Sequence, residues 1–319
     1  MSLPLTQTGD LSAPAATADS GQQVSIEHNA SPTGEKQDWN WLFAAIPGLT
    51  VFFALLAATA MTMLRSWWWE YTKPESYYGY AMFVPALVGL MFWHLRTQLL
   101  TVTKKPSPVA LLLLIPSFLL LIVASKHYMQ AVMSWTFLLS ITGAVWFVFG
   151  TAFLRVAAFP LLFLWLMAPL PGPVLNDLTI GVQNFSTIGA AKLLQLIGMH
   201  PNHVGNLIHL ENYTLNVDVP CSGFKQLLTL FTFSSAFAFL TDASLWRRWA
   251  IFLFSLPLSI FVNSVRIALI GIVGECLGAS AAHTFHDWSG MISLVLCMAI
   301  LFGTAKVLGC RTFAGQPIF

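Results

Sequence analysis

The sequence has few charged residues and few cysteines. Only 9% of its 319 residues are charged, against roughly a quarter in an ordinary soluble domain, so the composition excludes a typical soluble fold. The formal net charge is only +2 and no basic patch occurs, which argues against nucleic acid as a partner. The four cysteines have no CxxC spacing. They therefore favour neither a disulfide framework nor a zinc ribbon, and we expect no metal and no cofactor.

Long apolar runs take the place of the missing charges. Hydrophobic residues make up 56% of the chain, and runs of about 20 apolar residues are long enough to cross a bilayer as helices. We therefore predict an all-α polytopic membrane protein with about eight transmembrane helices. The expected spans are residues 41–64, 78–95, 108–125, 131–153, 156–170, 222–240, 249–272 and 288–306.

The distribution of Lys and Arg sets the expected orientation. Lys104-Lys105 and Arg247-Arg248 mark cytoplasmic turns, which places both termini in the cytoplasm. Residues 1–40 are rich in Ser, Thr, Ala, Gln and Gly and lack apolar periodicity, so we expect a disordered cytoplasmic tail. The transmembrane domain then covers residues 41–308, and residues 309–319 form a short cytoplasmic C-terminus.

Residues 171–220 form the long segment expected outside the membrane, between spans five and six. Apolar residues at helical spacing over 174–199 predict an amphipathic helix on the outer surface. Residues 206–219 then alternate between apolar and polar, which predicts a β-hairpin. We expect the two to form a small extracytoplasmic cap, able to bind an extended peptide by strand addition.

Three reactive side chains are predicted to lie at one membrane depth. Cys221 begins span six on the outer side, where polar residues give way to an apolar run. Arg266 follows the cytoplasmic Arg248 by 18 residues, about 27 Å along a helix, which brings it to the outer edge. His286 begins span eight on the same side. A thiol, a guanidinium and an imidazole at one depth indicate a catalytic site.

The chemistry of these groups suggests a role for each. A helix N-terminus and a nearby guanidinium both lower a thiol pKa, so Cys221 is the expected nucleophile. His286 is the expected general acid and base, with His283, three residues earlier, as the fallback. Arg266 stabilises the thiolate or, alternatively, an oxyanion.

Smaller parts are expected to complete the site. The backbone N–H groups of Ser222 and Gly223 are expected beside Arg266 at the oxyanion, and Gly223 lets a substrate carbonyl approach closely. Asp287 or a backbone carbonyl orients His286.

Other interpretations of these residues stay open. Taken singly, Cys221 is explained as a small hydrophobic residue, Arg266 as an interfacial anchor and His286 as an interfacial histidine. A membrane metalloprotease would use His283 and His286, with Asp287 or Glu275, to hold zinc. A transporter or assembly factor for polysaccharide export would use Arg266 to bind a charged substrate.

The motifs around these residues resemble those of the exosortase/archaeosortase family of membrane-embedded cysteine transpeptidases. The family's signatures are Cys-Ser-Gly at a helix start, Asn-x-x-Arg, and His followed by Ser-Gly. They correspond here to Cys221-Ser222-Gly223, Asn263-Ser264-Val265-Arg266 and His286-Asp287-Trp288-Ser289-Gly290. The likeness covers about residues 41–308 and includes residues 78–85, 159–171 and 205–210. Pro220 departs from the small residue that many members have before the cysteine.

The resemblance implies a function and a set of partners. Exosortases are thought to cleave a C-terminal sorting signal of exported proteins, which consists of a short motif such as Pro-Glu-Pro, a transmembrane helix and a basic tail. The protein is then transferred through a thioacyl intermediate to an envelope or exopolysaccharide-linked acceptor. The implied location is a bacterial or archaeal cytoplasmic (inner) membrane, with the site facing outward and with membrane lipid and exopolysaccharide machinery as partners. Ser222, Gly223, Asn263 and Asp287 are expected to line the substrate-binding part.

Overall fold

The computed structural model describes residues 40–73, 75–127, 129–218, 221–310 and 312–317. The tail expected over residues 1–40 lies outside this part of the chain, apart from Asn40. The chain divides into two units, residues 1–53 and residues 54–319. The packing described below is that of the second unit.

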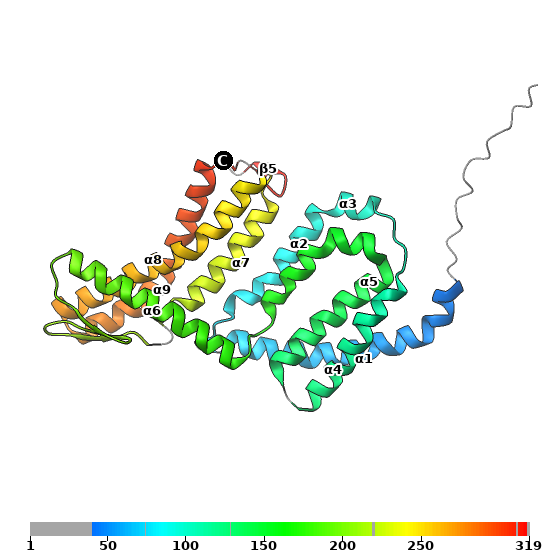
Figure 1. Cartoon of the computed structure of the whole chain (residues 1–319), viewed down its shortest axis with the longest axis horizontal. Helices are drawn as coiled ribbons and strands as arrows, with labels where there is room; N and C mark the ends of the chain where they lie inside the picture. Colours follow the sequence, from blue (N-terminus) through cyan, green and yellow to red (C-terminus); the bar gives the residue numbers. More distant parts are fainter. Residues whose placement is uncertain (1–39, 74, 128, 219–220, 311, 318–319) are drawn as a thin grey trace, which may run out of the picture. The chain divides into compact units, whose positions relative to one another are not determined.

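Helices dominate the described residues (Figure 1). The α-helices are α1 (Asn40–Thr72), α2 (Val84–His94), α3 (Arg96–Thr101), α4 (Leu111–Lys126), α5 (Gln130–Phe163), α6 (Gly172–Leu196), α7 (Phe224–Leu240), α8 (Leu245–Leu277) and α9 (Ala279–Val307). Short 3₁₀ helices are η1 (Gly79–Phe83), η2 (Pro108–Ala110) and η3 (Leu164–Met167). The strands are β1 (Asn202–Val204), β2 (Leu207–His209), β3 (Thr214–Asn216), β4 (Thr312–Phe313) and β5 (Gln316–Pro317).

The helices support an all-α membrane protein with several passes. Among the described residues, four helical segments are long and apolar enough to cross a bilayer: Pro108–Lys126, Gln130–Met167, Leu245–Leu277 and Ala279–Val307. Two shorter apolar helical segments, Gly79–His94 and Phe224–Leu240, coincide with the expected second and sixth spans. The count of eight spans and the orientation of the termini stay predictions.

The break between the expected fourth and fifth spans lies earlier than the sequence indicated. It was expected at residues 154–155, but α5 is kinked at Gly150, which has φ 83° and ψ 176°. The loop before α4 fills the kink: a Cβ on Gly150 would lie 1.8 Å from the carbonyl oxygen of Lys105. Glycine is therefore required by both the backbone conformation and the close approach of the loop.

The segment expected to form the cap contains α6 and a small antiparallel sheet. β2 pairs with β3, so a hairpin lies where the alternating pattern placed one, and β1 adds a third strand in the order β1-β2-β3. In β2, Ile208 is fully buried, while Leu207 and His209 are partly exposed. The position of this segment outside the membrane stays a prediction.

Helix α8 is the centre of the C-terminal half. It packs against α6, α7 and α9 (Figure 1). One apolar cluster joins α6, the sheet, α8 and α9, and includes Leu194, Ile208, Val217 and Ile267. Cys221 contacts this cluster as a partly buried residue. The packing of α6, the sheet, α8 and α9 therefore positions the segment that carries the thiol.

Candidate functional site

The thiol of Cys221 lies in a short turn, residues 221–223, that leads directly into α7. The Cys221 N–H donates to the Asp218 carbonyl at 2.8 Å, and Val219 and Pro220 lie outside the described residues. Gly223 is the N-cap of α7, with φ 84° in the left-handed region that favours glycine. The polar-to-apolar transition noted in the sequence is thus a turn that ends at a helix N-terminus.

The structure brings Cys221 and His286 into direct contact. The Cys221 Sγ faces the His286 Nε2, and the His286 Nδ1 lies 3.3 Å from the Asp287 Oδ1. His283 lies on the same helix, but its side chain is 81% exposed and its Nδ1 lies 3.6 Å from the Asp287 Oδ2. His286 is therefore the histidine at the thiol, and Asp287 lies beside both rings.

Arg266 reaches the same place from α8. Its Nε donates to the Ser289 Oγ at 3.0 Å, and its Nη2 lies 3.5 Å from the His286 carbonyl oxygen. The Ser289 hydroxyl in turn donates to the His286 carbonyl at 3.0 Å. Ser289 had no assigned role, although the three-residue spacing from His286 places both on one face of a helix.

Asn263 lies one turn before Arg266 and is fully buried. Its Nδ2 donates to the Cys221 carbonyl at 3.2 Å, and a Cβ on Gly223 would lie 2.5 Å from the Asn263 Cγ and Nδ2. The Asn263 Oδ1 is buried and has no hydrogen-bond partner among the described residues. Asn263 therefore holds the backbone of the turn and leaves one acceptor unused.

Two further polar side chains support this turn and were not singled out in the sequence. The Gln183 amide of α6 donates to the Val217 carbonyl, and the Ser186 hydroxyl donates to the Ser222 carbonyl at 3.3 Å. The Ser222 hydroxyl accepts from the Phe224 N–H at 3.2 Å. Ser186 and Ser222 are fully buried and Gln183 nearly so. The spacing of Gln183 and Ser186 on α6 did not predict these contacts, because only the tertiary fold brings this helix to the turn.

The electrostatics of the thiol differ from the expectation. Burial raises the pKa of Cys221 above its ordinary value, and nearby Arg266 opposes this effect without overcoming it. The carboxylates of Asp218, Glu75 and Asp287 raise the pKa of Cys221 further. The expected lowering of the thiol pKa is thus reversed, because desolvation penalises the thiolate more than one guanidinium stabilises it. A direct proton acceptor is therefore needed.

The helix ends also differ from the expectation. Arg266 and His286 were expected at the outer ends of their spans, but α8 continues to Leu277 and α9 begins at Ala279. His286 thus lies about two turns inside α9. Arg266 and His286 therefore lie within two adjoining helices and not at their ends.

The groups proposed to hold zinc do not converge. Glu275 accepts hydrogen bonds from the backbone N–H and the side-chain amide of Asn212. Within the described ranges, no group of three or more His, Cys, Asp or Glu side chains is placed to bind a metal ion. His286 instead directs its Nε2 at the thiol.

Comparison with known protein families identifies a family that this chain matches. A family model described as a transmembrane exosortase matches residues 67–303, which is well over half of the chain and includes every residue of the site described above. No curated protein and no solved structure matches the chain.

Proposed function

This chain belongs to the transmembrane exosortase family, and from that premise we propose that it is a membrane cysteine transpeptidase with Cys221 as its nucleophile. Membership of the family supports a membrane-embedded, sortase-like transpeptidase. The contact between the Cys221 Sγ and the His286 Nε2 is the observation that carries the assignment of residues. A nucleophile and a base within hydrogen-bond reach, with the base oriented by a third group, form the usual arrangement for covalent acyl transfer.

The proposed reaction has two steps. His286 accepts the proton of the Cys221 thiol, the sulfur forms a bond to the scissile carbonyl carbon, and the carbon–nitrogen bond breaks. The same proton passes from His286 to the leaving amine. An acceptor nucleophile then gives its proton to His286 and attacks the carbonyl carbon of the thioester. The carbon–sulfur bond breaks, the proton passes from His286 to the Cys221 sulfur, and the acylated acceptor is released.

The raised pKa of Cys221 explains why His286 is needed in the first step. A thiol with a raised pKa carries little thiolate at neutral pH, so the thiolate forms by proton transfer within the pair. Asp287 orients the imidazole through its Nδ1.

Arg266 supplies the positive charge of the proposed site. The guanidinium, fixed by Ser289, stabilises the thiolate or the oxyanion of the tetrahedral intermediate. Backbone N–H groups at Ser222 and Gly223 complete the oxyanion site.

The proposed substrate is an exported protein with a C-terminal sorting signal. The signal consists of a short motif of the Pro-Glu-Pro type, a transmembrane helix and a basic tail, and the product is transferred to an envelope or exopolysaccharide acceptor. In the proposed topology of eight spans, both termini are in the cytoplasm and the site faces outward. The segment of α6 and β1–β3 then forms an extracytoplasmic cap next to the thiol.

Processing of a tagged exported protein tests this proposal. The full chain is co-expressed with a protein that carries the tripartite tail, and cleavage is followed for the wild type and for Cys221→Ala, Arg266→Ala and His286→Ala. We expect all three variants to abolish or strongly reduce cleavage. Cys276→Ala is the matched control, because Cys276 is an exposed free cysteine on α8, and it is expected to process normally.

Two outcomes contradict the proposal. Normal cleavage by Cys221→Ala would exclude a thioacyl mechanism. Cleavage that is blocked by a chelator but resists thiol alkylation would favour a metalloprotease instead.

A further inference from the structure

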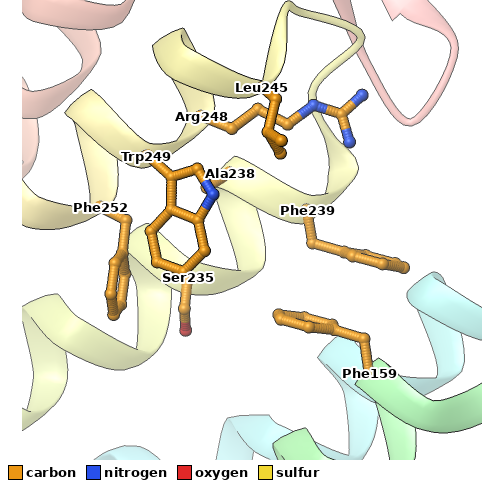
Figure 2. A pocket seen from close by; sticks show the side chains of 8 residues that line it. All are labelled: Phe159, Ser235, Ala238, Phe239, Leu245, Arg248, Trp249 and Phe252. Carbon is orange, nitrogen blue, oxygen red and sulfur yellow. The ribbon is translucent and has the colours of Figure 1, made fainter.

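A cavity lies far from the thiol, between α5, α7 and α8. Its volume is about 250 Å³, and Figure 2 shows the side chains that line it. They are Phe159, Ser235, Ala238, Phe239, Leu245, Arg248, Trp249 and Phe252. Arg248 and Arg266 are 18 residues apart on α8, or about 27 Å. The cavity therefore lies at the end of α8 opposite the candidate active site.

The walls of this cavity are aromatic and aliphatic. The rings of Phe159 and Phe239 stack with centroids 4.3 Å apart, and Trp249 meets Phe252 edge to face at 5.9 Å. Figure 2 shows the stacked pair facing Trp249 across the cavity. The hydroxyl of Ser235 donates to the Thr232 carbonyl at 2.9 Å, so it contributes little polarity. The interior is suited to a hydrocarbon chain.

The cavity has one cation in its lining. The Arg248 Nε donates to the Ala243 carbonyl at 2.9 Å, and no ion pair of Arg248 occurs among the described residues. Figure 2 shows its guanidinium at the end of the cavity away from Ser235. Arg155 is exposed and lies one turn from Phe159 on α5, which places a second cation on the same face. The nearby carboxylate of Asp242 accepts a hydrogen bond from Thr312 at 3.1 Å.

We propose that this cavity binds an anionic phospholipid, with one acyl chain against the aromatic walls and the phosphate at Arg248. Leu245 and Trp249 are 70% and 54% exposed, so the cavity is open on the side where an acyl chain would enter. Basic pockets between transmembrane helices bind anionic headgroups. A volume of about 250 Å³ suits a segment of one chain, whereas a helix about 10 Å wide does not fit. In the proposed orientation, the lipid comes from the cytoplasmic leaflet.

Lipid titration of the full chain in neutral detergent tests this site. The midpoint of thermal unfolding is followed as phosphatidylglycerol, phosphatidylcholine with the same acyl chains, or inorganic phosphate is added. We expect phosphatidylglycerol to raise the midpoint at the lowest concentration. Arg248→Gln is expected to weaken the apparent affinity for phosphatidylglycerol roughly fivefold, as the loss of one cation near an anionic lipid implies.

Two further variants complete the test, one as a control for the headgroup site and one to probe the acyl-chain site. Arg96→Gln is the matched control. Arg96 is exposed, its guanidinium lies 4.5 Å from the centroid of the Trp93 ring, and it does not line the cavity. The Arg96→Gln variant is therefore expected to keep the wild-type affinity for phosphatidylglycerol. Ala238→Leu narrows the cavity and is expected to weaken both phospholipids. Equal effects of the two phospholipids on the wild type, an unchanged affinity in Arg248→Gln, or the full effect from inorganic phosphate alone would each overturn the proposal.

Discussion

Replacement of Gly223 by alanine tests how the turn at Cys221 is built. Gly223 combines a φ of 84° with close packing, since an added Cβ would lie 2.5 Å from the Cγ and Nδ2 of Asn263. Carbon atoms in good contact lie about 3.5–4.0 Å apart. Alanine therefore requires Asn263 or the turn to move by roughly an ångström, which breaks the hydrogen bond from the Asn263 Nδ2 to the Cys221 carbonyl.

The cost of this substitution has two parts. A residue with a Cβ in the left-handed region costs about 1–2 kcal/mol, and forcing an extra carbon into a packed site costs about 1–3 kcal/mol. We therefore expect Gly223→Ala to lower the free energy of unfolding by roughly 2–5 kcal/mol, unless the turn relaxes. If the turn relaxes, the thiol moves away from His286, and processing falls while stability is retained.

Unfolding and processing should be measured together, with Gly181→Ala as the matched control. Gly181 lies inside α6, and nothing lies within 4 Å of an added Cβ. We expect this control to gain about 0.5–1 kcal/mol, as glycine replacement in a helix usually does. The reasoning is refuted if Gly223→Ala matches Gly181→Ala in both stability and processing.

A double substitution isolates the contact between the two residues. Asn263→Ala removes the two atoms at 2.5 Å and leaves the Asn263 Cβ at 2.9 Å. Gly223→Ala is therefore expected to cost less in the Asn263→Ala background, by at least about 0.5 kcal/mol, the lower range for residues in contact. Strict additivity would show that the two Asn263 atoms at 2.5 Å do not contribute to the cost of Gly223→Ala.

Three further outcomes are expected from the site. Ser289→Ala removes the hydroxyl that accepts the hydrogen bond of the Arg266 Nε, so the initial rate of processing should fall roughly tenfold. An unchanged rate would show that Arg266 does not need the Ser289 hydroxyl to hold its position. Because burial raises the pKa of Cys221, its thiol depends on His286 as a proton acceptor at neutral pH, and its alkylation by iodoacetamide should be slower in His286→Ala than in the wild type. Equal alkylation rates at neutral pH would contradict proton transfer to His286. His283→Ala should process within about twofold of the wild type, as expected for an exposed side chain away from the thiol, and a loss comparable to that of His286→Ala would reassign the base.

The sequence allowed the membrane class and the axial positions of the polar groups to be predicted. Apolar runs report whether a segment suits a bilayer, and the fixed rise of an α-helix converts residue counts into depth. This is why Arg266 and His286 could be expected at the level of Cys221. Helix ends were less predictable: α9 begins at Ala279, nine residues before the expected start, because polar residues such as His283 and Thr284 remain helical when the helix packs on α8.

Lateral contacts were decided by the tertiary structure. Ser289 holds Arg266, Asn263 fits against Gly223, and Gln183 reaches the Val217 carbonyl, yet each pair joins different elements that local periodicity does not relate. The direction of the Cys221 pKa shift was decided in the same way. The helix N-terminus and the guanidinium were visible in the sequence, whereas the burial that outweighs them arises only when α6, α8, α9 and the sheet pack around the turn.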